Sequence, residues 1–459
     1  MRLNNVFVGV GLSSSRVLVR WLILFGAVAC ALIGACANDR VTLYISMSVI
    51  CIVYFFIYTG VIGRVFIAIY FLMFVVGQMF FALLGLEVKD GFGVISPEVV
   101  YLFDCLLLIS LLFYLLPNLL IGPGRRGVFG VVTARETRLC VLLFAVLLLV
   151  VFLLFFDAGG YSGLVALDRS DLHSKPSISA VVVQYLLYFC APLIVVVRFI
   201  QITNSYRLSK YLYVWVALVV ANLVVAIYYK YRTIAFLHFA AFFVPYFLLS
   251  GKYGWEALSA KRKLAVLISL SGVFVAGLVF RVVRGYIGAE AELELNAAFF
   301  ESLYNITLYS GDLAYSLIGM RVLQEYGADD GFVFVSLIRA AFFFLPSFVW
   351  SGKPEDIQRV IGGDLFPDLP GMTLPPSLVG DAYLNLRYFF FLYFFSWGIG
   401  AALIDRSRWI YMVVFKAAVV GLAVHFSRGA VSNVLLLGVI LLFFSIVVVR
   451  SCDVRIIDK

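Results

Sequence analysis

Four arginines in apolar surroundings are the residues of this chain best suited to bind a phosphate group. Arg232 lies in YYKYRTIAF, Arg281 and Arg284 lie in VFRVVRGYIG, and Arg428 lies in HFSRGAVSN. A guanidinium group is planar, keeps its charge and can donate to two phosphate oxygens at once. Such arginines otherwise extend to lipid headgroups or pair with acidic side chains. If their segments converge, we expect these four side chains to surround a diphosphate.

Three other side chains could accept a proton from a hydroxyl nucleophile. His425 precedes Arg428 by three residues, so the two share a face if one helix continues across that junction. Histidine titrates near neutral pH, which suits a general base, and His173 in LDRSDLHSKPS is a second candidate. Asp381 begins an apolar segment in LVGDAYLNLRYFF, where its carboxylate could act as a base or simply cap a helix. We favour Asp381 over His425 as the base.

The chain carries no motif for a metal, nucleotide or redox cofactor. It has no Walker loop, dinucleotide fingerprint, CxxC or HExxH, and DRSD at 168–171 lacks the spacing of a DxD metal site. Its seven cysteines are scattered, mostly within apolar runs, as packing residues are. The sequence therefore predicts neither a metal nor a cofactor.

Membrane-spanning helices must position these groups. Of the 459 residues, 64% are hydrophobic and 13% are charged. Several apolar runs approach or exceed about 18 residues, the length of a membrane-spanning helix. Strands of a membrane barrel would alternate apolar and polar residues, which these runs do not. The predicted fold class is an all-α, polytopic integral membrane protein.

About twelve segments are predicted to span the membrane, and a long loop separates the ninth from the tenth. The first ends at LIGAC (32–36), which resembles a signal-processing site, but a second apolar run begins at Val41, so we expect this helix to be retained. The spans lie near 18–37, 41–60, 65–86, 98–121, 139–156, 178–199, 210–229, 232–250, 264–283, 380–404, 409–425 and 430–450. The domains are an N-terminal bundle (1–283), a large external loop (284–379), and C-terminal helices with a cytoplasmic tail (380–459).

Charge sets the predicted orientation. Placing both termini in the cytoplasm puts most of the 35 basic residues, and few of the 26 acidic ones, on the cytoplasmic side. The net charge of +9 then reflects orientation and lipid contact, and no basic run is long enough to predict nucleic-acid binding. In this orientation Arg428 and His425 meet the external face.

The external loop is itself apolar. Residues 297–323 and 332–350 are rich in aromatic and aliphatic side chains, the second being interrupted by Arg339 and Pro346. We expect helices that lie at the outer membrane interface or dip into it. A loop of this length is more often a lid or a substrate-binding element than a simple connection.

Three stretches resemble a known family, the Wzy-type oligosaccharide repeat-unit polymerases, which include O-antigen and enterobacterial common antigen polymerases. They are FFFLPSFVWSGKPEDI (342–357), GMTLPPSLVGDAYLNLRYFFF (371–391) and HFSRGAVSN (425–433). The chain departs from the family pattern at Asp381, where Glu is commoner, and after Asn385, where LRYFFF replaces a glycine-containing turn. The positions that carry the resemblance are Pro346, Ser347, Trp350, Lys353, Pro354, Ser377, Gly380, Asp381, Tyr383, Asn385 and Arg428.

The resemblance implies a metal-independent glycosyltransferase of GT-C-like architecture in the bacterial inner membrane. Its substrates would be undecaprenyl-diphosphate-linked oligosaccharides at the periplasmic face, and undecaprenyl diphosphate would leave. Expected partners are these lipids, the bilayer, a chain-length regulator and a flippase. Arg232, Arg281, Arg284 and Arg428 would then hold the donor diphosphate, and Arg339, Lys353, His173, Tyr383 and Asn385 would contact the acceptor.

Two other functions remain open on the sequence. An O-antigen ligase-like enzyme would use the same donor but transfer to lipid A-core. A lipid-linked oligosaccharide flippase or other transporter would carry charges deep in many spans and visible inverted repeats. Here most charges lie at span ends, with Asp104 and Lys416 as exceptions, and no repeat is visible.

Overall fold

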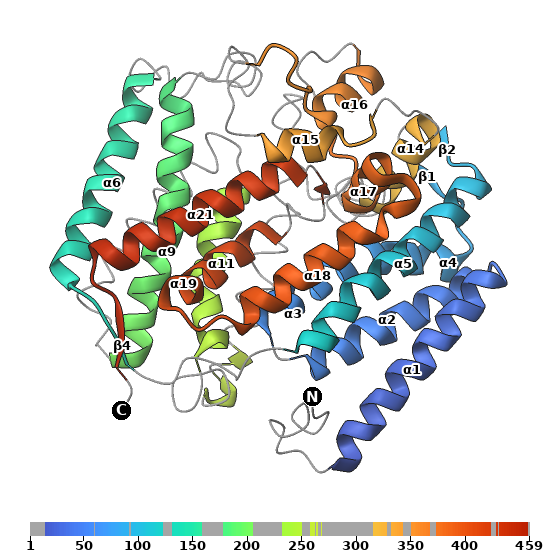
Figure 1. Ribbon diagram of the computed structural model, residues 1–459, viewed down its shortest axis with the longest axis horizontal. Coiled ribbons are helices and arrows are strands. Elements are labelled where there is room, and N and C mark those ends of the chain that lie inside the picture. Colours follow the sequence, from blue (N-terminus) through green and yellow to red (C-terminus); the bar gives the residue numbers. More distant parts are fainter. Residues whose placement is uncertain are drawn as a thin grey trace, which may run out of the picture.

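In the computed structural model the described part of the chain consists of helices and a few short strands (Figure 1). The described residues are 14–58, 60–90, 93–122, 131–157, 178–204, 232–249, 258–261, 263–264, 268, 315–327, 332–342, 350–367, 373–423, 428–429 and 431–457.

The first group of helices packs around α5 (Pro97–Ile121). It contains α1 (Ser14–Cys36), α2 (Arg40–Ile57), and the continuous helix α3 (Val61–Tyr70), η2 (Phe71–Val76) and α4 (Gly77–Leu84). Helix starts follow their local sequence: the Asp39 carboxylate accepts from Val41 N and Thr42 N, and the Ser96 hydroxyl accepts from Val99 N. α18 (Phe391–Arg406) lies along α5 and joins this group (Figure 1).

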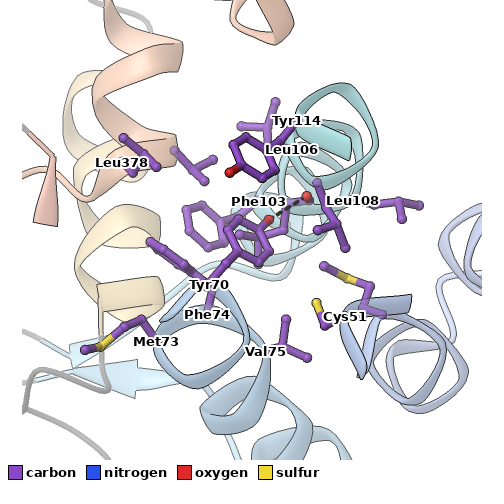
Figure 2. Packing of buried hydrophobic residues seen from close by; sticks show 14 of the residues in the cluster. Cys51, Tyr70, Met73, Phe74, Val75, Phe103, Leu106, Leu108, Tyr114 and Leu378 are labelled. Atoms are coloured by element: carbon purple, nitrogen blue, oxygen red, sulfur yellow. Dashed lines mark hydrogen bonds between the residues drawn. The ribbon is translucent and has the colours of Figure 1, made fainter. Parts of the chain in front are cut away.

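The core of this group reaches the helix that carries Asp381. Aromatic rings of Tyr70, Phe74 and Phe103 fill the space between η2 and α5 (Figure 2). Tyr70 donates from its hydroxyl to Leu107 O at 2.7 Å, so its polar end is satisfied inside the apolar core. Leu378, the first residue of α17 (Leu378–Leu386), belongs to the same cluster (Figure 2). The α17 segment is therefore anchored to the bundle core.

The second group lies on the other side of the molecule (Figure 1). It consists of α6 (Glu136–Asp157), α9 (Ile178–Asn204), α11 (Arg232–Leu248), α19 (Ile410–Val419), η8 (Val420–Leu422) and α21 (Val431–Ser451), which share one apolar core. At one end, β3 (Val131–Thr133) pairs antiparallel with β4 (Arg455–Ile457). This pairing puts the segment before α6 and the end of α21 on the same face of the molecule.

A third set of short helices lies along the upper edge in Figure 1. It comprises α14 (Tyr315–Tyr326), α15 (Val335–Ala341), α16 (Ile357–Leu365) and α17, with the two-residue strands β1 (Lys89–Asp90) and β2 (Gly93–Val94) beside them. Val322, Phe332, Ile357, Ile361 and Leu384 form a small apolar core of their own. That core holds α16 over α14 and α17.

Six helices in the described part of the chain are long and apolar enough to cross a membrane. These identify an α-helical chain suited to a multi-pass membrane protein. Two of the twelve predicted spans, 210–229 and most of 264–283, lie outside the described residues. The six are Val19–Cys36, Arg40–Ile57, Val61–Leu84, Pro97–Ile121, Val182–Thr203 and Val434–Ser451.

The predicted span at 380–404 is not one straight helix. Leu378–Phe389 and Phe391–Arg406 meet at 115°, and counting the bent pair as one crossing gives a seventh candidate span. The break lies at Arg387, whose backbone has φ +50° and ψ −125°. Arg387 and Asn385 are the polar residues next to this break, and the apolar residues on both sides keep the mean hydropathy of the whole segment high, so the composition alone does not reveal the bend.

The prediction of interfacial helices in the external loop needs a correction for α14. This helix, at the end of the predicted 297–323 segment, buries most of its residues between α5 and α17. α15 fits the prediction better, since Phe334, Ile338 and Phe342 are exposed at a spacing of four along one face. Its other face carries the buried residues Ser336 and Ala340.

Lys416, the basic residue in the middle of a predicted span, is buried and stabilises a helix end. Its ammonium donates to Asp405 O at 2.9 Å and Ser407 O at 2.7 Å, where α18 ends. The Asp405 carboxylate in turn accepts from Ile62 N and Gly63 N, both at 3.0 Å, where α3 begins. These contacts join α3, α18 and α19 at the end of the bundle opposite α14–α17 (Figure 1).

Candidate functional site

Asp381 lies in the first turn of α17 and is fully buried. Ser377 precedes the helix with φ +64° and accepts from Gly380 N at its hydroxyl, 3.1 Å away. Asp381 N donates to Ser377 O at 2.9 Å, which closes the first turn. The helix cap at the start of α17 is therefore supplied by Ser377.

The Asp381 carboxylate belongs to a buried group of polar side chains. Its Oδ1 accepts from Ser336 Oγ at 2.8 Å and from Asn385 Nδ2 at 2.9 Å. Ser336 is on α15, whereas Asn385 lies one turn further along α17. The two donors satisfy this carboxylate oxygen in its buried position.

Asn385 connects α17 to the start of α15. Its Oδ1 accepts from Ser336 N at 2.8 Å, and its backbone oxygen accepts from Phe334 N at 3.0 Å. Its Nδ2 also donates to Asp381 O at 2.8 Å. In this structure the amide is engaged by protein groups, which suits positioning of Asp381 and α15 more than direct contact with a sugar.

Arg428 reaches this region from a distant part of the sequence. Its neighbour Gly429 has φ +87°, and a Cβ on residue 429 would come within 2.6 Å of Ser377 O. The guanidinium carbon of Arg428 lies 5.7 Å from the centre of the Tyr315 ring, within range of a cation–π contact. Its Nε is buried and has no hydrogen-bond partner among the described residues. The Arg428 guanidinium, whose Nε has no hydrogen-bond partner among the described residues, therefore lies close to the start of α17.

α14 makes an equally close contact with the same turn. A Cβ on Gly319 would lie 2.4 Å from Ser377 Oγ and 2.5 Å from the Phe103 ring. Only glycine lets α14 approach this closely. Ser377 is therefore the point where α14, α17 and the segment of Arg428 and Gly429 meet.

Arg339, which is predicted to bind the acceptor, contacts the loop before α16. This loop contains Lys353, a second predicted acceptor residue. Arg339 donates from Nη1 to Pro354 O at 2.8 Å and lies 3.7 Å from the Asp356 carboxylate. Asp356 caps α16 by accepting from Gln358 N at 3.1 Å. Lys353 is half-buried, and its backbone N donates to Trp350 O. Arg339 therefore holds the loop that presents Lys353.

Tyr383, the remaining described acceptor residue, lies beside Arg387 at the bend. The Arg387 guanidinium carbon is 5.7 Å from the Tyr383 ring, and Nη1 donates to Gly327 O at 2.6 Å. A positive φ is unfavourable for a residue with a Cβ, so these contacts hold strained backbone in place. The bend occurs directly after Asn385, in the LRYFFF segment.

Several predicted residues cannot be located in the site. His173, His425, Arg281 and Arg284 lie outside the described residues, and Arg232 begins α11 with its side chain outside them. Sequence reasoning missed Ser336 and Tyr315, because a single serine or tyrosine in an apolar helix carries no distinguishing signal. Only the tertiary contacts identify them.

No family model, curated protein or solved structure matches this chain. The resemblance of its three short stretches to repeat-unit polymerases stays a prediction.

Proposed function

We propose that this protein is a metal-independent membrane glycosyltransferase that joins undecaprenyl-diphosphate-linked oligosaccharide repeat units at the periplasmic face of the bacterial inner membrane. One observation carries the proposal. Asp381, the candidate base that we favour over His425, and Arg428, a candidate diphosphate-binding residue, lie on segments that meet at Ser377. A base and an anion-binding group are the two parts that such a transfer requires.

In the proposed reaction, a hydroxyl of the acceptor sugar attacks the anomeric carbon of the donor. The new glycosidic C–O bond forms, the bond from the anomeric carbon to the diphosphate oxygen breaks, and Asp381 takes the hydroxyl proton. Undecaprenyl diphosphate leaves with additional negative charge on its leaving oxygen. A fixed cation close to that oxygen stabilises the developing charge, more strongly where water is excluded.

The residues around Asp381 and Arg428 support these roles. Ser336 and Asn385 orient the Asp381 carboxylate by donating to the same oxygen. Arg428 retains an unused Nε donor among the described residues. Lys353 is proposed to meet the phosphates of the acceptor lipid, with Arg339 holding its loop through Pro354 O and Asp356.

The test is a glycan ladder from a deletion strain complemented with single variants. Arg428→Ala is expected to collapse the ladder to one repeat unit at normal protein level. Arg450→Ala is the control, because Arg450 is an exposed arginine in the last turn of α21, the helix that follows Arg428 in the chain. A normal ladder from Arg428→Ala would contradict the assignment of Arg428.

The same gels separate polymerase from ligase. Loss of a polymerase leaves single repeat units attached to lipid A-core. Loss of a ligase leaves full-length chains on the lipid carrier and none on lipid A-core. The second pattern would replace the proposed activity by the ligase-like one.

A further inference from the structure

A chain of polar side chains runs through the apolar core of the first helix group. Arg40, the first residue of α2, donates from Nε to Asp104 Oδ2 at 2.7 Å, and the Tyr44 hydroxyl donates to Asp104 Oδ1. Arg40 Nη2 donates to Gln78 Oε1 at 2.7 Å. Gln78 Nε2 then donates to Ser316 Oγ at 2.9 Å. The network (Asp104, Arg40, Gln78 and Ser316) thus links α5, α2, α4 and α14.

This network is unusual because its members are charged or polar yet lie inside a membrane-suited bundle. The Asp104 side chain is 2% exposed and that of Arg40 is 20% exposed. Gln78 and Ser316 are buried as well. Burying a charge pair brings a large desolvation penalty, so such a pair is weak evidence for stability and stronger evidence for a requirement on geometry.

Directional hydrogen bonds constrain α14 in a way that apolar packing does not. Apolar helix faces can shift past one another with a small loss of packing free energy. A shift of α14, in contrast, would separate Ser316 from Gln78 and leave a buried amide unpaired. The close contact of Gly319 with Ser377 and Phe103 sets the distance of α14 from α5 and α17. The hydrogen-bond network sets the position of α14 along the axes of these helices.

The far end of the network adjoins the candidate site. Ser316 follows Tyr315 in α14, and the Tyr315 ring is 5.7 Å from the Arg428 guanidinium carbon. The position of the aromatic face determines where the guanidinium is most stable. Any displacement at Ser316 is therefore passed to Arg428 through the adjacent residue.

We infer that the Asp104–Arg40–Gln78–Ser316 network positions Tyr315 and, through it, the guanidinium of Arg428 for binding a diphosphate. The inference rests on the proposed function for the ligand of Arg428. None of the four network residues touches the diphosphate; they are positioning residues that act through α14.

The test compares two buried serines in the purified full-length protein, with inorganic diphosphate as the probe and binding measured by titration calorimetry. Ser316→Ala removes the end of the network. Ser110→Ala is the matched control, since Ser110 is a buried serine on α5 that lies 2.9 Å from the Tyr70 hydroxyl. Ser316→Thr keeps a hydroxyl and serves as the rescue variant.

Ser316→Ala is expected to weaken diphosphate binding about fivefold, the effect of losing one hydrogen bond. Ser110→Ala is expected to bind as the unmodified protein does, although both variants lower the melting temperature. Ser316→Thr is expected to recover most of the affinity. Equal diphosphate affinity for the two alanine variants would overturn the inference, because a merely structural role predicts it.

Arg428→Ala separates this result from a failure of the proposed function. If Arg428→Ala binds diphosphate normally, the assignment of Arg428 fails, whatever Ser316→Ala does. If Arg428→Ala abolishes binding while Ser316→Ala binds as the control does, the assignment stands and the positioning role is wrong. Should Ser316→Ala not fold, Gln78→Leu removes the same link from the α4 side, and the same comparison applies.

Discussion

Gly429 packs its backbone directly against Ser377, and a Cβ at residue 429 would come within 2.6 Å of the Ser377 carbonyl oxygen. Ser377 begins the turn that carries Asp381, and Gly429 follows Arg428. The contact therefore joins the candidate base and the candidate diphosphate-binding arginine through two adjacent stretches of backbone.

Gly429→Ala tests whether this contact is required. The substitution is expected to destabilise the fold by about 1–2 kcal/mol from its left-handed backbone alone, and the clash with Ser377 adds to this. Thermal unfolding in detergent measures the loss. Gly438→Ala is the control, because Gly438 lies in α21, the helix that follows Gly429, with nothing within 4 Å of the added Cβ. A loss as large at residue 438 would contradict the explanation.

Asp381→Asn tests the proposed base with little change in shape. The amide cannot take the proton, so transfer activity is expected to fall about 100-fold or more while the protein still folds. Polymerisation from purified lipid-linked repeat units in proteoliposomes measures this. Asp364→Asn, at an exposed position on α16, is the control. Full activity from Asp381→Asn would exclude Asp381 as the base and move that role to His425.

Arg387 offers a test of the strained bend between α17 and α18. Arg387→Gly and Arg387→Ala remove the same guanidinium contact with Gly327 O, but only glycine tolerates φ +50° without strain. The glycine variant is expected to be more stable than the alanine variant by about 1 kcal/mol or more. Their melting temperatures in one detergent give the difference. Equal stability would mean that the backbone at residue 387 relaxes without cost.

Lys416→Met separates stability from activity. Loss of the two hydrogen bonds to Asp405 O and Ser407 O is expected to destabilise the protein by about 1–3 kcal/mol. The lysine is far along the bundle from α14–α17, so the glycan ladder per folded molecule should stay unchanged. Thermal unfolding and the ladder, normalised to protein level, check both parts. A shortened ladder at unchanged stability would show a functional role for Lys416.

Local chemistry explains what could be predicted of the fold. Runs of apolar residues predicted helices at α1, α2, α5 and α21, and in the structure Asp39 and Ser96 cap two of them. These features depend only on residues within a few turns of one another. Arg428, Asp381 and Asn385 were likewise identified as candidates from residue type and short motifs.

The sequence by itself determined which segments are apolar enough to be helices in a membrane and which charged residues stand out among them. Only the tertiary structure decided that α14 is buried, that the predicted span at 380–404 bends by 115°, and that Asn385 holds α15. It also decided that Arg40 pairs with Asp104 and that Gly429 meets Ser377. The reason is physical. The hydropathy of a segment and the capping of a helix depend on residues that are neighbours in the sequence. A hydrogen-bond partner or a close backbone contact between helices depends on how segments distant in the sequence pack together.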